Sequence, residues 1–126
     1  MVFDFPEAVA VAAENIAAAG LADRLSVLGG DVAVDAIGSV GGSDYDLVWC
    51  SSVLHFVPDT EAVLRKILAA LRPGGALICA HAEIGDTPAA AVEVLQYYLP
   101  MLMQWRHVGL RGEMAGALRR SGYCLR

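Results

Sequence analysis

Several signals of location are missing from this 126-residue sequence. It has no run of about 18 consecutive apolar residues, which a membrane-spanning helix requires. Its opening residues lack the basic flank, apolar core and small-residue cleavage site that mark a secretory signal. We therefore expect a cytoplasmic protein without a membrane partner.

Positive charge is also scarce. Lys66 is the single lysine, and 9 Lys and Arg residues face 14 Asp and Glu residues, which gives a formal net charge of −5. Proteins that bind nucleic acid cluster their cations to contact phosphates. Because this sequence has no Lys/Arg run, we expect no nucleic-acid partner.

Residues that bind metals do not form a recognisable pattern. The three cysteines are Cys50, Cys79 and Cys124. They show no C-x-x-C spacing and their number is odd, so buried free thiols are expected. His81, Glu83 and Asp86 lie close together in sequence, but a fourth zinc ligand is not evident. We expect a hydrated loop there and no metal.

Strand and helix patterns alternate along the sequence, which is typical of α/β proteins with a parallel sheet. We expect strands at residues 1–4, 24–28, 46–51 and 76–81, and a further strand beginning at 122–126. We expect helices at residues 6–19, 60–71, 88–99 and 112–121. Asp59 is expected to cap the second helix, residues 72–75 to end it with a turn, and Pro100 to break or kink the third.

Asp4 ends the first of these strands. In nucleotide-binding α/β folds, an acidic residue that ends the second strand hydrogen-bonds the ribose hydroxyls, and a glycine-rich loop lies about 20 residues before it. Only three residues precede Asp4 in this sequence. The chain is therefore predicted to be an incomplete Rossmann-like α/β domain without the first strand and its glycine loop.

An ordered set of short motifs resembles S-adenosylmethionine-dependent class I methyltransferases, most closely the small-molecule O-methyltransferases. The motifs are Asp4-Phe5-Pro6-Glu7-Ala8-Val9, Asp23-Arg24, Gly30-Asp31, Val53-Leu54-His55 and Leu71-Arg72-Pro73-Gly74-Gly75. The resemblance covers about residues 3–125, and residues 1–126 are interpreted as a partial methyltransferase catalytic domain. It implies S-adenosylmethionine as the cofactor and a small-molecule acceptor, and it leaves open O-, N- or C-methylation.

The resemblance also implies which residues bind the cofactor. Asp4 would accept hydrogen bonds from the ribose hydroxyls, and Phe5 would pack beside the adenosine. Asp31 would accept a hydrogen bond from the adenine amino group and Val32 would contact the adenine ring, and Gly30 before them is assigned to the same site. Ser51, at the end of a predicted strand, is assigned to the same site. Two alternatives stay open: Asp4 as a helix-entry cap and Asp31 as an ordinary turn acid.

His55 matches the general base of these O-methyltransferases, which takes the proton of the acceptor hydroxyl. An imidazole suits this role because its ordinary pKa lies near neutrality. The sequence departs from the family pattern around it. The family's orienting glutamate is replaced by His81, unless Glu83 substitutes for it. A structural histidine is the alternative for His55.

An apolar stripe in the third helix has two interpretations. Its members are Val94, Leu95, Tyr98, Leu99, Met101, Leu102 and Trp105. By resemblance it would line the acceptor pocket, whereas its spacing alone is typical of core or subunit-contact packing.

The absent strand belongs at the centre of the class I sheet, so its loss is expected to split the sheet. The exposed edges would then favour a homo-oligomer or a second chain that completes the sheet. A fragment, a split subunit and a degenerate paralogue are the three explanations. The alternative to methyl transfer is a non-catalytic interaction subunit, and an NAD-dependent oxidoreductase half is a third reading that leaves Val53-Leu54-His55 unexplained.

Overall fold

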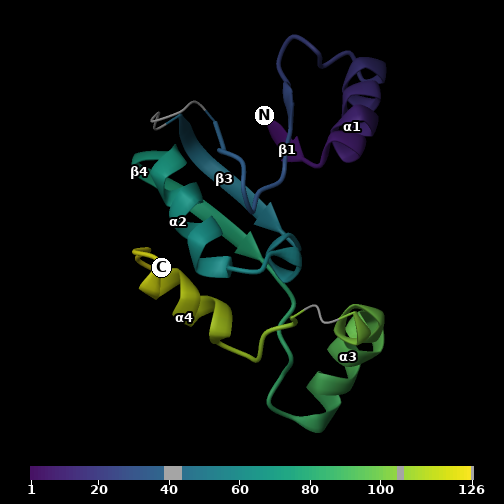
Figure 1. The fold of residues 1–126 in the computed structure, drawn as a ribbon, viewed down its shortest axis with the longest axis vertical. Helices are drawn as coiled ribbons and strands as arrows, with labels where there is room; N and C mark the ends of the chain where they lie inside the picture. The colour runs from purple at the N-terminus through teal and green to yellow at the C-terminus, as the bar shows by residue number, and fades with distance from the viewer. Residues whose placement is uncertain (39–43, 105–106, 126) are drawn as a thin grey trace. The chain divides into compact units, whose positions relative to one another are not determined.

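The computed structural model describes residues 1–38, 44–104 and 107–125. They form two compact units, Met1–Ile37 and Gly38–Arg126, and Figure 1 labels most of their helices and strands. Each unit contains two parallel strands joined by a helix, and the strands form two separate two-stranded sheets, β1-β2 and β3-β4. The predicted parallel α/β architecture and the split of the sheet are thus both present.

The first unit is built from β1 (Val2–Asp4), α1 (Pro6–Ala18) and β2 (Val27–Gly29). Pro6 occupies the first helical turn, where its missing N–H group costs nothing. Val9 of α1 is buried, and a Cβ on Gly29 would lie 3.3 Å from the Val9 side chain. Glycine therefore lets α1 approach the end of β2 closely.

A strand was predicted at residues 24–28, and the predicted first residue was wrong. The N–H groups of Arg24 and Leu25 both donate to the Leu21 carbonyl, at 3.0 and 2.9 Å. These bonds form a turn, so the two residues cannot donate to a sheet ladder. The strand begins at Val27 as a result.

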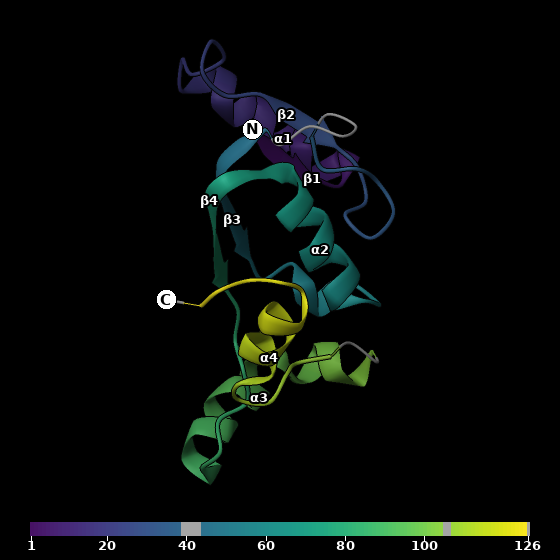
Figure 2. The same cartoon turned by 90° about the vertical axis from the view of Figure 1, so that its left-hand side faces the viewer.

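The second unit contains β3 (Tyr45–Ser51), the 3-10 helix η1 (Leu54–Phe56), α2 (Thr60–Ala70) and β4 (Leu71–Ala80). The cap of α2 is confirmed, since Asp59 Oδ1 accepts the Ala62 N–H at 2.9 Å. Figure 2 shows α2 on one side of the β3-β4 pair. The helix buries one face, made of Val63, Leu64, Ile67 and Ala70.

Residues 72–75 differ from the predicted helix-ending turn because they lie within β4. Tyr45 pairs with Leu71 and Leu47 with Ala76, so β4 carries extra residues between these pairs and bulges. Gly74 has a φ of +82°, and a Cβ on Gly75 would lie 3.1 Å from the Tyr45 carbonyl oxygen. The two glycines are thus required where the strand bulges.

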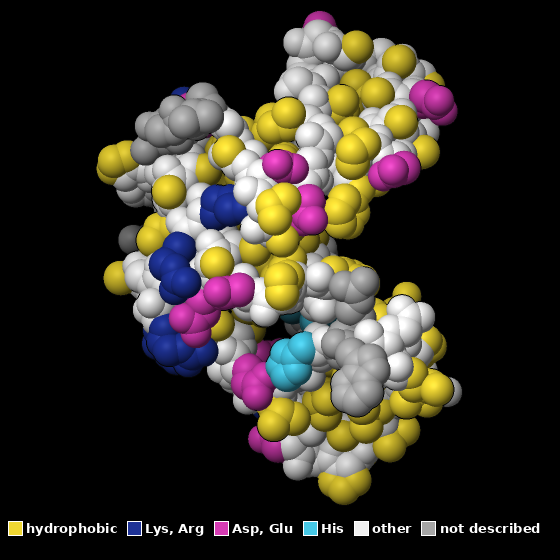
Figure 3. Space-filling view, viewed as in Figure 1, with side chains coloured by type: hydrophobic (Ala, Val, Ile, Leu, Met, Phe, Trp, Pro, Cys, Tyr) yellow, Lys and Arg dark blue, Asp and Glu magenta, His cyan; other side chains and the backbone are white. Residues whose placement is uncertain are grey.

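The rest of the second unit contains α3 (Pro88–Met103) and α4 (Glu113–Arg120). Pro100 lies inside α3 and does not end it, and the α3 ribbon bends in Figure 2, as predicted for a kink. No described residue of α3 is buried, and hydrophobic side chains gather over this helix in Figure 3. The half-buried Tyr98 belongs to the predicted stripe, whereas Trp105 lies outside the described residues.

The strand predicted to begin at residue 122 is not formed in residues 122–125. The Gly122 and Tyr123 N–H groups donate to the carbonyls of Arg119 and Leu118, at 3.1 and 3.0 Å. Gly122 adopts a φ of +97°, which is typical of a glycine after a helix end. These N–H groups cap α4 and are therefore not available for a sheet.

Candidate functional site

The first group of candidate residues lies at the carboxyl edge of the β1-β2 sheet. Asp4 pairs in register with Gly29, and the Gly30 N–H donates to the Asp4 carbonyl at 2.9 Å. Because parallel strands end at the same edge, the turn that starts at Gly30 lies next to Asp4 and Phe5. The structure thus brings together the predicted cofactor residues of this unit.

Asp4 does not cap α1. Its Oδ1 accepts the N–H of Phe5 at 2.8 Å, and Phe5 is itself the residue at the start of the helix, which has no side-chain cap. A carboxylate has about four acceptor sites on two oxygens, so this bond leaves Asp4 able to accept hydroxyl protons. The Phe5 side chain is 52% exposed beside it, and an exposed aromatic ring offers a stacking surface.

The turn after β2 is organised by two aspartates. The Asp31 carboxylate accepts the Ala33 N–H, and its own N–H donates to Asp35, both at 2.8 Å. Asp31 therefore has the turn-forming role that was the alternative interpretation. Gly30 is packed against the Phe3 ring, since a Cβ there would lie 2.9 Å from that ring, and Val32 beside it is half-buried. The exposed Asp4 carboxylate and Phe5 ring at this edge fit the hydroxyls and the base of a nucleoside.

The second group of candidates follows β3 in the other unit. Ser51 is the last residue of β3, and Ser52, with a φ of +55°, turns the chain into η1. His55 in η1 is 5% exposed, and its Nε2 is a buried atom without a hydrogen-bond partner in the part of the chain that the structure describes. Its ring lies 5.0 Å from the His81 ring and 5.3 Å from the Tyr98 ring, between centroids.

The environment of His55 favours its neutral form. Burial lowers the pKa of His55, and a hydrogen bond with the His107 backbone partly opposes this. A neutral imidazole at pH 7 is what a general base requires, because its lone pair must be free to accept a proton. The unpartnered Nε2 matches that requirement.

His81, Glu83 and Asp86 each have a separate partner. His81 Nε2 accepts the Leu54 N–H at 2.9 Å. Glu83 accepts the N–H groups of Gly112 and Met114, at 2.9 and 2.8 Å, and so caps the start of α4. Asp86 pairs with Arg111 at 3.3 Å. The suggestion that Glu83 replaces the family's orienting glutamate is therefore not supported by its contacts.

Two of the cysteines lie side by side on the neighbouring strands β3 and β4. Cys50 and Cys79 pair in register, and the Cys79 Sγ lies 3.7 Å from His81 Nδ1. The hydrogen bond from Cys50 lowers the pKa of Cys79, and the same bond together with burial raises that of Cys50. All three cysteines are free thiols, as predicted, but only Cys50 is buried, while Cys79 is half-buried and Cys124 is exposed. Within the described ranges, no three His, Cys, Asp or Glu residues gather as a metal site.

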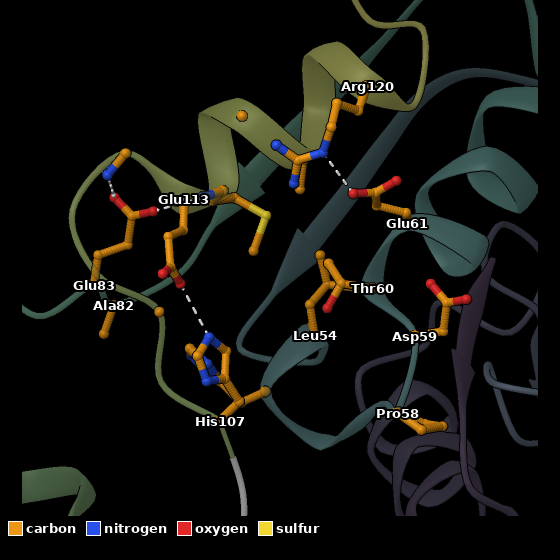
Figure 4. Close-up of a pocket in the computed structure, with 16 residues that line it drawn as sticks. Leu54, Pro58, Asp59, Thr60, Glu61, Ala82, Glu83, His107, Glu113 and Arg120 are labelled. Carbon is orange, nitrogen blue, oxygen red and sulfur yellow. Dashed lines mark hydrogen bonds and ion pairs between the residues drawn. The ribbon is translucent and has the colours of Figure 1, made fainter.

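A pocket of about 710 Å³ opens beside His55. Its wall includes Leu54 and His55 of η1, the start of α2, and the residues of α4. Figure 4 shows Arg120 directed at Glu61 and His107 at Glu113; their separations are 2.7 and 3.0 Å. The side of this wall formed by Glu61 and Arg120 has no signal in the sequence, because nothing in the sequence links two residues 59 positions apart.

Residues 2–77 match the methyltransferase domain family. Over 104 residues the chain is 29% identical to 3-hydroxy-5-methyl-1-naphthoate 3-O-methyltransferase from Streptomyces sahachiroi. This match covers 81% of this chain and 29% of that protein. The structure resembles an O-methyltransferase family 2 protein from Planctomyces limnophilus solved with apigenin, with a TM-score of 0.77, 26% identity, and coverage of 94% of this chain and 36% of that one. It also resembles methyltransferase CalO6, with a TM-score of 0.73 and 32% identity. That match covers 99% of this chain and 42% of CalO6.

The chain therefore belongs to the S-adenosylmethionine-dependent class I methyltransferases, and its fold is part of their Rossmann-like fold. It spans about 29–42% of the length of these relatives. Within the described residues, no helix is long and apolar enough to cross a membrane.

Proposed function

We propose that this chain carries part of a methyltransferase that transfers a methyl group to a hydroxyl of a small molecule, with His55 as the general base. The observation that carries the proposal is the buried Nε2 of a histidine with a lowered pKa, which has no hydrogen-bond partner among the described residues. Two O-methyltransferases among the similar proteins support the hydroxyl as acceptor. The decisive experiment, His55→Ala, is described in the Discussion.

In this proposal the first unit holds the nucleoside of the cofactor. When bound, S-adenosylmethionine supplies a methyl group on a positively charged sulfur. Asp4 would accept hydrogen bonds from the ribose hydroxyls, and Phe5 would pack beside the adenosine. The turn of Gly30, Asp31 and Val32 would contact the adenine. Ser51, in the second unit, is proposed as a further cofactor contact. His55 would take the hydroxyl proton of the acceptor, and the cofactor would supply the methyl group with its sulfur leaving as a neutral thioether.

A test of the cofactor site uses the 126-residue chain itself. We expect S-adenosylmethionine to bind it with a dissociation constant of about 1 mM or weaker, because the contacts proposed at the edge of β1 and β2 are made to the nucleoside and not to the methionine portion. Isothermal titration calorimetry at millimolar cofactor measures this affinity. A micromolar dissociation constant would show that the edge formed by β1 and β2 suffices for binding.

A non-catalytic interaction subunit is the second candidate, and one exposed surface favours it. Leu47 and Trp49 of β3 and Ile78 of β4 lie on one sheet face and are 55%, 66% and 42% exposed. We propose that the 126-residue chain self-associates through this face, since exposed apolar patches and strand edges drive association. In the longer relatives, further polypeptide is available to cover such a face.

Light scattering tests this association. We expect particles heavier than the 13.3 kDa monomer, and Trp49→Glu should shift the population toward the monomer because it places a charge on the apolar face. Val34→Glu is the matched control, since Val34 is 76% exposed and lies in the loop after β2. A wild-type monomer that unfolds cooperatively would contradict the association.

A further inference from the structure

His81 is held between two partners at the end of β4. Its Nε2 lies 2.9 Å from the Leu54 backbone nitrogen, and its Nδ1 lies 3.7 Å from Cys79 Sγ. A backbone N–H can only donate, so Nε2 accepts and carries no proton. The single ring proton of neutral His81 is then on Nδ1 and directed at the Cys79 sulfur. The two contacts therefore define both the tautomer and the orientation of the ring.

The Leu54 N–H is the first donor of η1, the helical turn that carries His55. Such first donors have no partner within the helix and need one from elsewhere. Val53, which precedes the turn, provides no side-chain cap. His81, 27 positions later in the chain, provides the acceptor instead. Its ring also packs against the His55 ring, with centroids 5.0 Å apart.

We infer that His81 is a positioning residue for His55. Its Nε2 fixes the turn that carries His55 to the end of β4, and its neutral ring limits the space in which the His55 ring can rotate. Cys79 supports the arrangement by holding the Nδ1–H side of His81. This inference rests on the proposed function only insofar as it treats His55 as the base; the fixing of the turn is independent of catalysis.

Glu83 is the alternative positioning residue, and its contacts exclude it. Both carboxylate oxygens accept N–H groups at the start of α4. The other groups that face His55 are the Tyr98 ring, the His107 backbone and the Cys79 thiol. Among these groups, His81 is the one that also bonds the backbone of η1.

A matched pair of variants tests the inference in the 126-residue chain. His81→Gln keeps an acceptor near the position of Nε2, whereas His81→Asn is too short to reach Leu54. In His81→Asn we expect the Leu54 amide to exchange its hydrogen about five- to tenfold faster, as the loss of one hydrogen bond implies. In His81→Gln the exchange rate should stay near that of the wild type. Amide exchange measured by NMR gives both values.

Catalysis by the same variants reports on His55. In the active methyltransferase, His81→Asn should lower kcat roughly tenfold or more through displacement of the base, and His81→Gln should restore most of it. The KM for S-adenosylmethionine should not change in either variant.

Two results would overturn the inference. One is an unchanged Leu54 exchange rate in His81→Asn. The other is a Glu83→Ala variant that accelerates Leu54 exchange as much as His81→Asn does. If instead His55→Ala left turnover normal while His81→Asn released the Leu54 amide, the proposed base would be wrong and the role of His81 in holding the turn would stand.

Discussion

Replacing His55 with alanine should lower kcat by roughly 10²- to 10⁴-fold in the assembly that carries methyltransferase activity. The imidazole takes a proton mainly in the transition state, so the affinity for S-adenosylmethionine should remain nearly unchanged. In the wild type, kcat should fall as the pH drops through the pKa of His55, since the protonated ring cannot accept a proton. That midpoint should lie below the ordinary histidine value of about 6.5, because burial lowers the pKa.

Asp4→Ala is the matched control for this prediction because it should change the affinity for S-adenosylmethionine. Loss of the carboxylate should weaken cofactor binding by about 1.5–3 kcal/mol, which is typical of hydrogen bonds to a charged group. Steady-state kinetics combined with cofactor titration separates the two variants. Near-normal turnover of His55→Ala would leave His55 as a structural residue.

The second large effect is expected in the core of the second unit. Leu64 of α2 has no exposed surface, and a buried leucine cut back to alanine leaves a cavity. Leu64→Ala should therefore reduce the free energy of unfolding by about 2–5 kcal/mol. Urea denaturation followed by circular dichroism measures this difference, with all samples at one protein concentration.

Leu68→Ala is the control, since it makes the same chemical change on the same helix. Leu68 is 37% exposed, so water already reaches part of its side chain and its loss should cost about 1 kcal/mol or less. Equal losses in the two variants would contradict the packing described for α2. Tyr123 should remain in place in both, because its hydroxyl donates to the backbone carbonyl of Leu64 at 2.9 Å.

Sequence patterns predicted the features that depend on near neighbours. The Asp59 cap joins residues three positions apart, and Pro6 starts α1 through its own fixed φ. Val63, Leu64 and Ile67 recur at helical spacing and form the buried face of α2. The family motifs located Asp4 and Gly30, which β1 and β2 bring to one edge by their parallel register.

The remaining features depend on partners that are distant in the chain. Leu25 and Tyr123 carry residue types that suit strands, but their N–H groups bond to carbonyls in the preceding turn or helix. Glu83 and His81 lie in one short stretch, yet Glu83 caps a helix about 30 residues later while His81 accepts from a residue 27 positions earlier.

The sequence by itself thus determined the family, the parallel α/β elements and the candidate residues, because local spacing and motif order carry that information. The tertiary structure alone decided that Glu83 caps α4 and that His81 lies against His55, since a polar group is satisfied by whichever partner folding brings within hydrogen-bond distance.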